Sequence, residues 1–266
     1  NGLPRFACLI GHFQRCFNVK KISQFPLPVV VFFVAMFLVQ GRVAGNEDQN
    51  SPKWAIVIHG GAGSTPKDSD SPRTRAKRAA LKQALDAGVE LLEKGGSSLD
   101  AVEVGIRILE DNPSFNAGKG AVKNARGQHE LDASIMHGEN LDAGAVAGVS
   151  TVKSPIALAR AVMEDSPHVM LAGAGAEAFA AEQGFDPVSS NYFATERRRE
   201  ALEAYKANEQ AGLNPEADHK FGTVGVVVLD QAGNLIAGTS TGGMTGKRWG
   251  RIGDSPVIGA GTYADN

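Results

Sequence analysis

The sequence predicts an α+β protein built as a layered sandwich of helices and sheet. Predicted helices are clustered between runs of strands and do not alternate with them one for one, which argues against a regular parallel sheet. The 266 residues are 42% hydrophobic and 21% charged, which is ordinary globular composition with room for one large domain or two small ones. The 32 glycines predict many turns and close backbone approaches.

Residues 1–45 are set apart from this fold as a leader and signal peptide. Lys20 and Lys21 precede an apolar run, Val29–Val39, and small residues follow in Gln40–Gly45. A secretory signal typically has a charged n-region, an apolar stretch of this length and small residues at its cleavage site. We therefore expect a secreted or periplasmic protein. The alternative is an uncleaved membrane anchor.

Charge and cysteine content narrow the class of function further. The net charge of −2 gives no field that favours nucleic acid or an anionic membrane. Both cysteines, Cys8 and Cys16, lie in the leader. After export we therefore expect no disulfide framework and no thiolate metal site. Once the signal is cleaved, we also expect no stable insertion in a membrane.

The first part of the mature chain predicts a strand and two helices. Ser97 with Asp100 forms a capping box at the start of the second helix, and Pro113 follows its end. The expected elements are a buried strand over Trp54–His59, a helix over Arg73–Lys94 and a helix from Ser97 to about Asp111.

The middle of the chain predicts two short strands and three helices. Pro155 suits the first turn of a helix, and Gly184 suits a helix end. The last helix is highly charged and leads into a polar linker, Asn214–Lys220. The expected elements are strands near Glu130–Met136 and Ala143–Ser150, and helices from Pro155 to about Glu164, over Gly173–Gln183 and over Thr195–Gln210.

A β-hairpin follows the linker. Its strands are Val224–Leu229 and Leu235–Ser240, and Gly233 suits the φ > 0 position of the loop between them. If Asp230 pairs with Asn234, the register places Thr223 opposite Thr241. Directly opposed side chains lie about 5 Å apart at Cβ.

The Gly222-Thr223 bond lies where the polar linker meets the first hairpin strand. A threonine becomes a good nucleophile when a base takes its proton, and a chain cut just before Thr223 would supply its own α-amine as that base. Such amines titrate near pH ~8. The alternative is a strand that simply begins with a β-branched residue after a glycine turn.

The segment Arg251-Ile252-Gly253-Asp254 can bind a zwitterion. Arginine forks onto a carboxylate, and aspartate accepts hydrogen bonds from an ammonium group. We therefore assign all four residues to substrate binding. The alternative is an internal ion pair between Arg251 and Asp254 at the surface.

Two other ligand classes are disfavoured. The glycines of Gly60–Gly63 follow a strand but lack the Gly-Lys-Ser/Thr of a phosphate-binding loop. They are expected to let this loop pack closely beside the site. His59, His129 and His219 show no metal-ligand spacing, which disfavours zinc.

The chain resembles the plant-type asparaginases, also called isoaspartyl peptidases, which are N-terminal nucleophile hydrolases. The resemblance covers roughly Trp54 to Asn266. The segments that carry it are Ile58–Gly63, Phe115–Gly118, Glu130–Ser134, Ser166–Val169, Gly222–Gly225, Thr239–Thr245, Gly250–Pro256 and Gly259–Gly261.

The resemblance implies a four-layer αββα sandwich and a precursor that cleaves itself between Gly222 and Thr223. An α-subunit portion would then comprise residues 46–222, and the β subunit would begin at Thr223, so that residues 223–266 are its first part. Two such αβ units would form a dimer. The implied reaction is hydrolysis of L-asparagine or of β-aspartyl (isoaspartyl) dipeptides, which releases aspartate.

The resemblance also implies roles for single residues. Thr223 matches the nucleophile and amine base, Thr241 an assisting hydroxyl, Arg251 the ligand of the substrate α-carboxylate and Asp254 that of the α-amine. Asn116 matches a polar residue near the nucleophile, and Gly61 belongs to the supporting loop. No cofactor is implied beyond a structural Na⁺, bound by main-chain oxygens around Leu109, Glu110, Asn112, Phe115, Ala117 and Lys119.

Two alternative functions stay open. A glycosylasparaginase-like amidase would carry aspartate before the nucleophile, where this chain has Gly222. A non-catalytic, membrane-tethered periplasmic module would never cleave.

The chain ends at Tyr263–Asn266, inside the pattern of the family. There the family continues with a strand and a Thr-Gly-Thr-Gly-like turn that completes the oxyanion site. We therefore expect the sandwich to be incomplete within these 266 residues, and expect the residues alone to lack part of that site.

Overall fold

The computed structural model describes residues 54–62, 71–213 and 222–266. The predicted leader, both cysteines and the whole linker Asn214–Lys220, with His219, lie outside the described residues. Every described residue belongs to one compact unit, residues 52–266.

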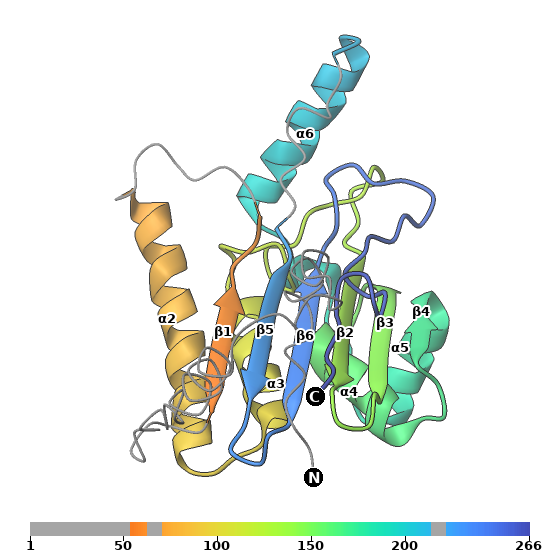
Figure 1. Ribbon diagram of the computed structural model, residues 1–266. Coiled ribbons are helices and arrows are strands. Elements are labelled where there is room, and N and C mark those ends of the chain that lie inside the picture. Colours follow the sequence, from red (N-terminus) through yellow and green to blue (C-terminus); the bar gives the residue numbers. More distant parts are fainter. Residues whose placement is uncertain (1–53, 63–70, 214–221) are drawn as a thin grey trace, which may run out of the picture. The chain divides into compact units, whose positions relative to one another are not determined.

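A six-stranded sheet in the order β1-β5-β6-β2-β3-β4 forms the centre of this unit (Figure 1). Neighbouring strands pair antiparallel except β3 and β4, which are parallel. The strands are β1 (Ala55–His59), β2 (Leu131–His137), β3 (Ala143–Val149), β4 (Met170–Ala172), β5 (Val224–Leu229) and β6 (Leu235–Thr241).

Helices cover one face of the sheet. Helix α3 packs on β5 and β6, α4 on β2 and β3, α5 on β3, and α2 on α3 and β1 (Figure 1). The helices are α2 (Pro72–Glu93), α3 (Ser98–Glu110), α4 (Pro155–Asp165), α5 (Gly173–Glu182) and α6 (Glu196–Gln210), with a 3₁₀ turn η2 (Ser190–Tyr192).

Local sequence signals explain where two of these helices begin. The Ser97 side chain accepts a hydrogen bond from the Asp100 amide at the start of α3, as predicted. Pro155 occupies the first turn of α4, where its missing N–H leaves no hydrogen bond unmade. The predicted bounds of these helices agree with the structure to within one or two residues.

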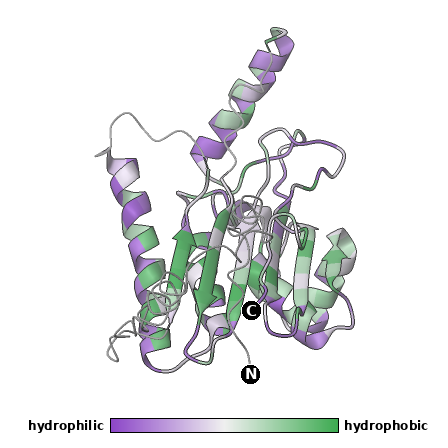
Figure 2. Ribbon diagram, viewed as in Figure 1, coloured by the Kyte–Doolittle hydropathy of each residue, from purple (hydrophilic) through white to green (hydrophobic). Residues whose placement is uncertain are grey.

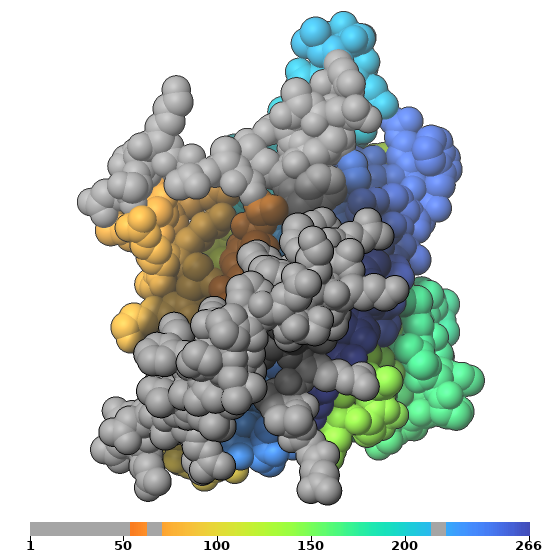
Figure 3. All heavy atoms as spheres, viewed as in Figure 1, coloured from red at the N-terminus to blue at the C-terminus, as the bar shows by residue number. Residues whose placement is uncertain are grey.

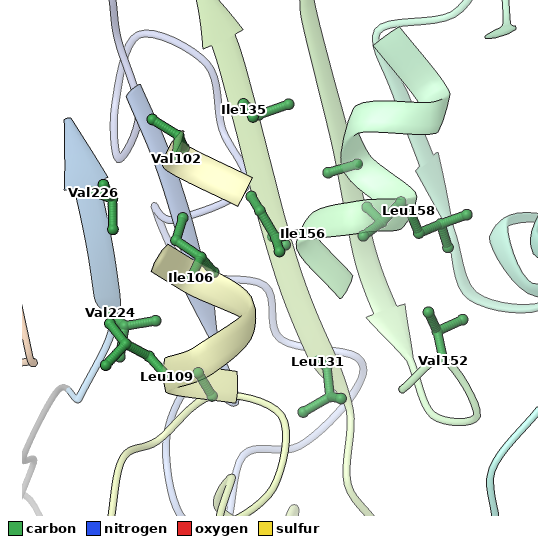
Figure 4. Packing of buried hydrophobic residues seen from close by; sticks show 14 of the residues in the cluster. Val102, Ile106, Leu109, Leu131, Ile135, Val152, Ile156, Leu158, Val224 and Val226 are labelled. Carbon is green, nitrogen blue, oxygen red and sulfur yellow. The ribbon is translucent and has the colours of Figure 1, made fainter. Parts of the chain in front are cut away.

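Alternation along each strand separates the two faces of the sheet. Val224, Val226 and Val228 of β5 are buried beneath the helices, together with Ile106 and Leu109 of α3 (Figure 4). On the opposite face of β5, Val227 is 41% exposed. The strands colour as hydrophobic while much of the outer surface of α2 and α6 is hydrophilic (Figure 2).

The prediction of a buried strand at 54–59 is wrong in one respect. Strand β1 forms as expected but lies at the edge of the sheet, and Val57 is 67% exposed. Among the described residues, the helices cover only the other side of β1, where Ile56 and Ile58 pack.

The second face of the sheet is covered over β2 and β6 by the segment that follows β6. Ala264 packs with Met136 and Ala237, and the Asn266 side chain accepts a hydrogen bond from the Leu235 amide at 2.9 Å. The α+β class is confirmed. The described sheet and its single helical layer are consistent with an N-terminal nucleophile hydrolase sandwich.

The hairpin register is confirmed. Val224 pairs with Ser240 and Leu229 with Leu235, and the Asp230 amide donates to Asn234 O at 3.1 Å. Gly233 has φ of 90°, the left-handed conformation that the loop required. Continuing the register by one pair places Thr223 opposite Thr241.

Helix α6 projects from the end of the sheet (Figure 1), and in the space-filling view it lies beside residues that follow β6 (Figure 3). Leu202 is its buried residue. Glu209 pairs with Arg248 at 2.7 Å, and the Tyr205 ring packs against Gly246. Within the described part of the chain, no helix combines the length and apolarity needed to cross a bilayer.

Candidate active site

Thr223 lies immediately before β5, with its side chain half-buried between two other hydroxyls. Its Oγ1 donates to Thr241 Oγ1 at 3.2 Å and lies 3.1 Å from Ser255 Oγ. The first contact is the one that the hairpin register predicted. The second joins Thr223 to the segment after β6, so three hydroxyl oxygens meet at one point.

Glycines bring the Gly222-Thr223 junction into close contact with two loops. A Cβ on Gly61 would lie 2.9 Å from both Cα and C of Gly222, and Gly61 has φ of 103°. A Cβ on Gly222 would lie 2.7 Å from Asn116 Cβ. Any side chain at either glycine would therefore displace the peptide unit before Thr223.

Asn116 is buried and holds two loops together beside this junction. Its Nδ2 donates to Gly243 O at 2.8 Å, and its Oδ1 accepts from the Val122 amide at 2.8 Å. Its own carbonyl accepts from the Gly242 amide at 3.0 Å. In this structure Asn116 supports the backbone around Thr241 and Thr223.

Arg251 and Asp254 lie on the loop after β6, with neither side chain paired to the other. Among the described residues, no hydrogen bond or ion pair engages the Arg251 guanidinium or the Asp254 carboxylate. A Cβ on Gly253 would lie 3.0 Å from Arg251 Nη1, so this glycine leaves room for the guanidinium. Asp254 and Ile252 are exposed. The alternative of an internal ion pair is therefore not what the structure contains.

Lys247, on the same loop, forms a buried charge pair with Asp132 of β2. Lys247 Nζ donates to Glu130 O at 2.8 Å and lies 3.9 Å from Asp132 Oδ2. Asp132 Oδ1 accepts from the Gly148 amide at 2.9 Å, while Oδ2 has no hydrogen bond. Burial raises the pKa of Asp132 and lowers the pKa of Lys247, because each loses water.

Sequence reasoning gave no role to Ser255, Lys247 or Asp132. The strand register could predict the position of Thr241. Ser255 and Lys247 lie on an irregular loop, whose path the sequence pattern does not predict. Asp132 offered a weak signal. It is the cross-strand partner of Thr241, and an acidic residue inside a buried strand requires a partner.

The main-chain oxygens predicted to bind Na⁺ lie at the end of α3 and in the loop that follows it. The loop is closed by a hydrogen bond from the Lys119 amide to Glu110 O at 2.7 Å. The carbonyls of Leu109, Asn112 and Phe115 also accept hydrogen bonds, but each has a second lone pair. A Na⁺ site bound by these oxygens stays a prediction.

The Glu110 side chain joins three elements behind the same loop. It accepts hydrogen bonds from Ser240 Oγ at 2.7 Å, Ser154 Oγ at 2.6 Å and the Ile156 amide at 3.0 Å. Burial raises the pKa of this carboxyl to about 7. Glu110 therefore fixes the end of α3 to α4 and β6.

Histidines do not form a metal centre in the part of the chain that the structure describes, where no group of three or more His, Cys, Asp or Glu side chains could hold an ion. His59 is exposed at the sheet edge. His129 is buried, its Nδ1 lies 3.2 Å from Val122 O, and burial lowers its pKa to about 4.

Sequence comparisons identify relatives of this chain. The chain is 49% identical over 220 residues to the isoaspartyl peptidase of Salmonella typhimurium, an alignment that covers 80% of this chain and 70% of the relative. The Escherichia coli isoaspartyl peptidase is 48% identical over 220 residues, which cover 80% of this chain and 68% of the relative.

A human relative extends the comparison beyond bacteria. The chain is 45% identical over 212 residues to the isoaspartyl peptidase/L-asparaginase of Homo sapiens, covering 79% of this chain and 67% of the relative. The chain thus spans about two thirds of the length of these relatives. The sequence profile described as asparaginase matches residues 52–266. The chain therefore belongs to the asparaginase family, within the N-terminal nucleophile hydrolases.

Proposed function

We propose that the protein is a self-processing threonine amidohydrolase that cleaves L-asparagine, β-aspartyl dipeptides or both. The observation that carries the proposal is the contact of Thr223 Oγ1 with Thr241 Oγ1 at 3.2 Å, at a junction packed between Gly61 and Asn116. Names of relatives support the substrate class, since they include isoaspartyl peptidase and isoaspartyl peptidase/L-asparaginase.

The first reaction is cleavage of the chain itself. Thr223 Oγ1 attacks the carbonyl carbon of Gly222, the C–N bond breaks, and the amide nitrogen takes the hydroxyl proton. Water then hydrolyses the resulting ester. The products are a carboxylate on Gly222 and a free α-amine on Thr223, so one cut creates both the nucleophile and its base.

The second reaction uses that new terminus. The α-amine accepts the proton of Thr223 Oγ1, which attacks the side-chain carbonyl of the substrate. Ammonia or an amino acid leaves with that proton, and water releases aspartate from the enzyme ester. Arg251 binds the substrate α-carboxylate and Asp254 its α-ammonium, which fixes the carbonyl at the nucleophile.

Variants of Thr223 test this proposal. Thr223→Ala should neither cleave nor hydrolyse, while Thr223→Ser should retain part of both activities because it keeps a hydroxyl. Cleavage is followed on denaturing gels, and hydrolysis by aspartate release from L-asparagine and from a β-aspartyl dipeptide. Hydrolysis by Thr223→Ala at the wild-type rate would refute the proposed nucleophile.

We also propose export by the segment of residues 1–45, with Lys20, Lys21 and Val29–Val39 as its support. Protein recovered from the periplasm or medium should begin close to residue 46. Recovery of the full segment in the membrane fraction would favour an anchor.

Two assembly features of the family are further proposals. A dimer of αβ units predicts about twice the protomer mass in light scattering, and a monomer would contradict it.

Na⁺ in the loop that begins at Leu109 predicts a higher melting temperature in sodium chloride than in choline chloride of equal ionic strength, because binding to the folded state alone stabilises it. Equal melting temperatures would argue against that ion.

A further inference from the structure

Ser134, Thr239 and Thr262 form a cluster of hydroxyls, which we call the hydroxyl cluster; Ser134 and Thr262 are buried and Thr239 is half-buried. Ser134 of β2 and Thr239 of β6 are cross-strand partners on the face away from the helices. Ser134 Oγ lies 3.2 Å from Thr239 Oγ1 and 2.7 Å from Thr262 Oγ1, and the two threonine oxygens lie 2.8 Å apart. The hydroxyls therefore contact one another in a closed triangle.

One backbone carbonyl, that of Ser255, lies against all three hydroxyls. Ser134 Oγ lies 2.6 Å from Ser255 O, Thr239 Oγ1 lies 2.9 Å from it and Thr262 Oγ1 3.3 Å. The carbonyl has two lone pairs, so two hydroxyls can donate to it while the third donates within the triangle. Every hydroxyl proton then has an acceptor inside the cluster.

The chain returns to this carbonyl through a tight turn. The Val257 amide donates to Asp254 O at 2.8 Å, and the Gly259 amide donates to Thr262 O at 2.8 Å. Gly261 packs directly against the backbone of Asp254 and Ser255, where a Cβ would clash. The turn thus brings Thr262 back against the residue where it began.

The residue held by the cluster bears directly on the candidate site. Ser255 Oγ lies 3.1 Å from Thr223 Oγ1, and Asp254 is the residue directly before Ser255 in the chain. A displacement of Ser255 would therefore move both the hydroxyl beside the nucleophile and the carboxylate that faces the substrate ammonium. Displacements of about 1 Å can lower a rate by as much as 100-fold.

We propose that the hydroxyl cluster has a positioning role. It holds Ser255 Oγ against Thr223 and keeps the Asp254 carboxylate where it can bind the substrate α-ammonium. Ser134, Thr239 and Thr262 act through Ser255 and are positioning residues. Ser255 itself contacts the reacting oxygen. The inference rests on the proposed function, since it assigns a role within the same site.

Thr239→Val is the most direct test, because valine keeps the shape of threonine and removes its hydroxyl. Its matched control is Ser240→Ala, which removes a buried hydroxyl from the next residue of β6, on the opposite face, where it donates to Glu110. Thr239→Ser restores the hydroxyl. All three variants are compared with wild type as the complete chain.

We expect Thr239→Val to lower kcat/KM roughly 10- to 100-fold, with KM raised and kcat lowered. Ser240→Ala should keep KM within about twofold of wild type even where it lowers the melting temperature, and Thr239→Ser should recover most of kcat/KM. A purely structural role would reduce the amount of active enzyme without changing KM. An unchanged KM in Thr239→Val would overturn the proposal.

Hydrogen exchange tests the cluster independently of activity. In Thr239→Val, the amides of Val257 and Gly259 should exchange at least severalfold faster than in wild type, while Ser240→Ala leaves them unchanged. Equal protection in both variants would overturn the positioning role even if the wild type proves inactive. Inactive wild type with faster exchange in Thr239→Val would instead refute the proposed function and leave the cluster assignment standing.

Discussion

The two faces of the sheet differ in chemistry although the same strands build both. On β2, Leu131, Ala133 and Ile135 face the helices, whereas Asp132 and Ser134 face the other way. The first set packs in the apolar core of Figure 4, and the second joins the loop after β6. One face stabilises the fold, and the other places polar groups around Thr223.

The comparison teaches how the site obtains rigid walls. Because successive side chains of a strand point to opposite faces, each residue that faces the site is followed by one that faces the core. On β6, Thr239 and Thr241 face the site, while Ser240 between them is fixed to Glu110. The strand that carries Thr239 and Thr241 is also anchored in the apolar core on its other face, where Ile236 packs.

The largest effect should come from the Asp132–Lys247 pair, where the site face buries charge. Asp132→Asn should destabilise the fold by about 3 kcal/mol, because it leaves the Lys247 ammonium buried without that counter-charge. Asp132→Asn with Lys247→Met should cost less than the sum of the two single changes. Denaturant unfolding of all four proteins measures the coupling, and additive costs would contradict it.

The same pair has a pH signature. A lysine whose pKa is lowered in the folded state binds fewer protons there than in the unfolded chain, so rising pH favours folding below its ordinary value of 10.5. Loss of Asp132 removes a charge that raises the pKa of Lys247. The defect of Asp132→Asn should therefore shrink between pH 7 and pH 9.

Arg251 tests whether the site face binds substrate. Arg251→Ala should raise KM roughly 100-fold for substrates with a free α-carboxylate, since it removes a charge-assisted contact worth up to about 3 kcal/mol. Arg248→Ala is the control, because that arginine lies three residues away and pairs with Glu209. Steady-state kinetics that show equal KM in Arg251→Ala and wild type would refute the assignment.

Two adjacent valines of β5 allow the simplest comparison of the two faces of the sheet. Val226 is 1% exposed beneath the helices and Val227 is 41% exposed on the opposite face. Val226→Ala should destabilise by about 2–3 kcal/mol, through lost burial and a residual cavity. Val227→Ala should cost less than about 1 kcal/mol. Equal costs in denaturant unfolding would show that the exposed face of β5 is covered in solution.

The smallest effect is expected at His129, just before β2. Its folded pKa of about 4 lies below its ordinary 6.5, so stability is full above pH 6.5 and falls as pH drops toward 4. His129→Gln should flatten the stability profile across that interval, measured by thermal unfolding. A profile as steep as that of wild type would contradict the role of His129.

Local signals predicted most of the fold and part of the site. Ser97 and Pro155 mark helix starts, and Gly233 sets the hairpin register that places Thr223 opposite Thr241. Strand β4 was missed because Met170–Ala172 is too short to show a period. Ser255 was missed because only the folded path of the loop after β6 brings it to the nucleophile.

The central claim is that the chain cuts itself before Thr223, and the most direct measurement is the sequence of any new N-terminus. Purified wild-type protein is resolved on a denaturing gel, and the smaller fragment is sequenced from its amino end. The account predicts Thr-Val-Gly-Val, beginning at Thr223. A single uncut chain that still hydrolyses asparagine would contradict it.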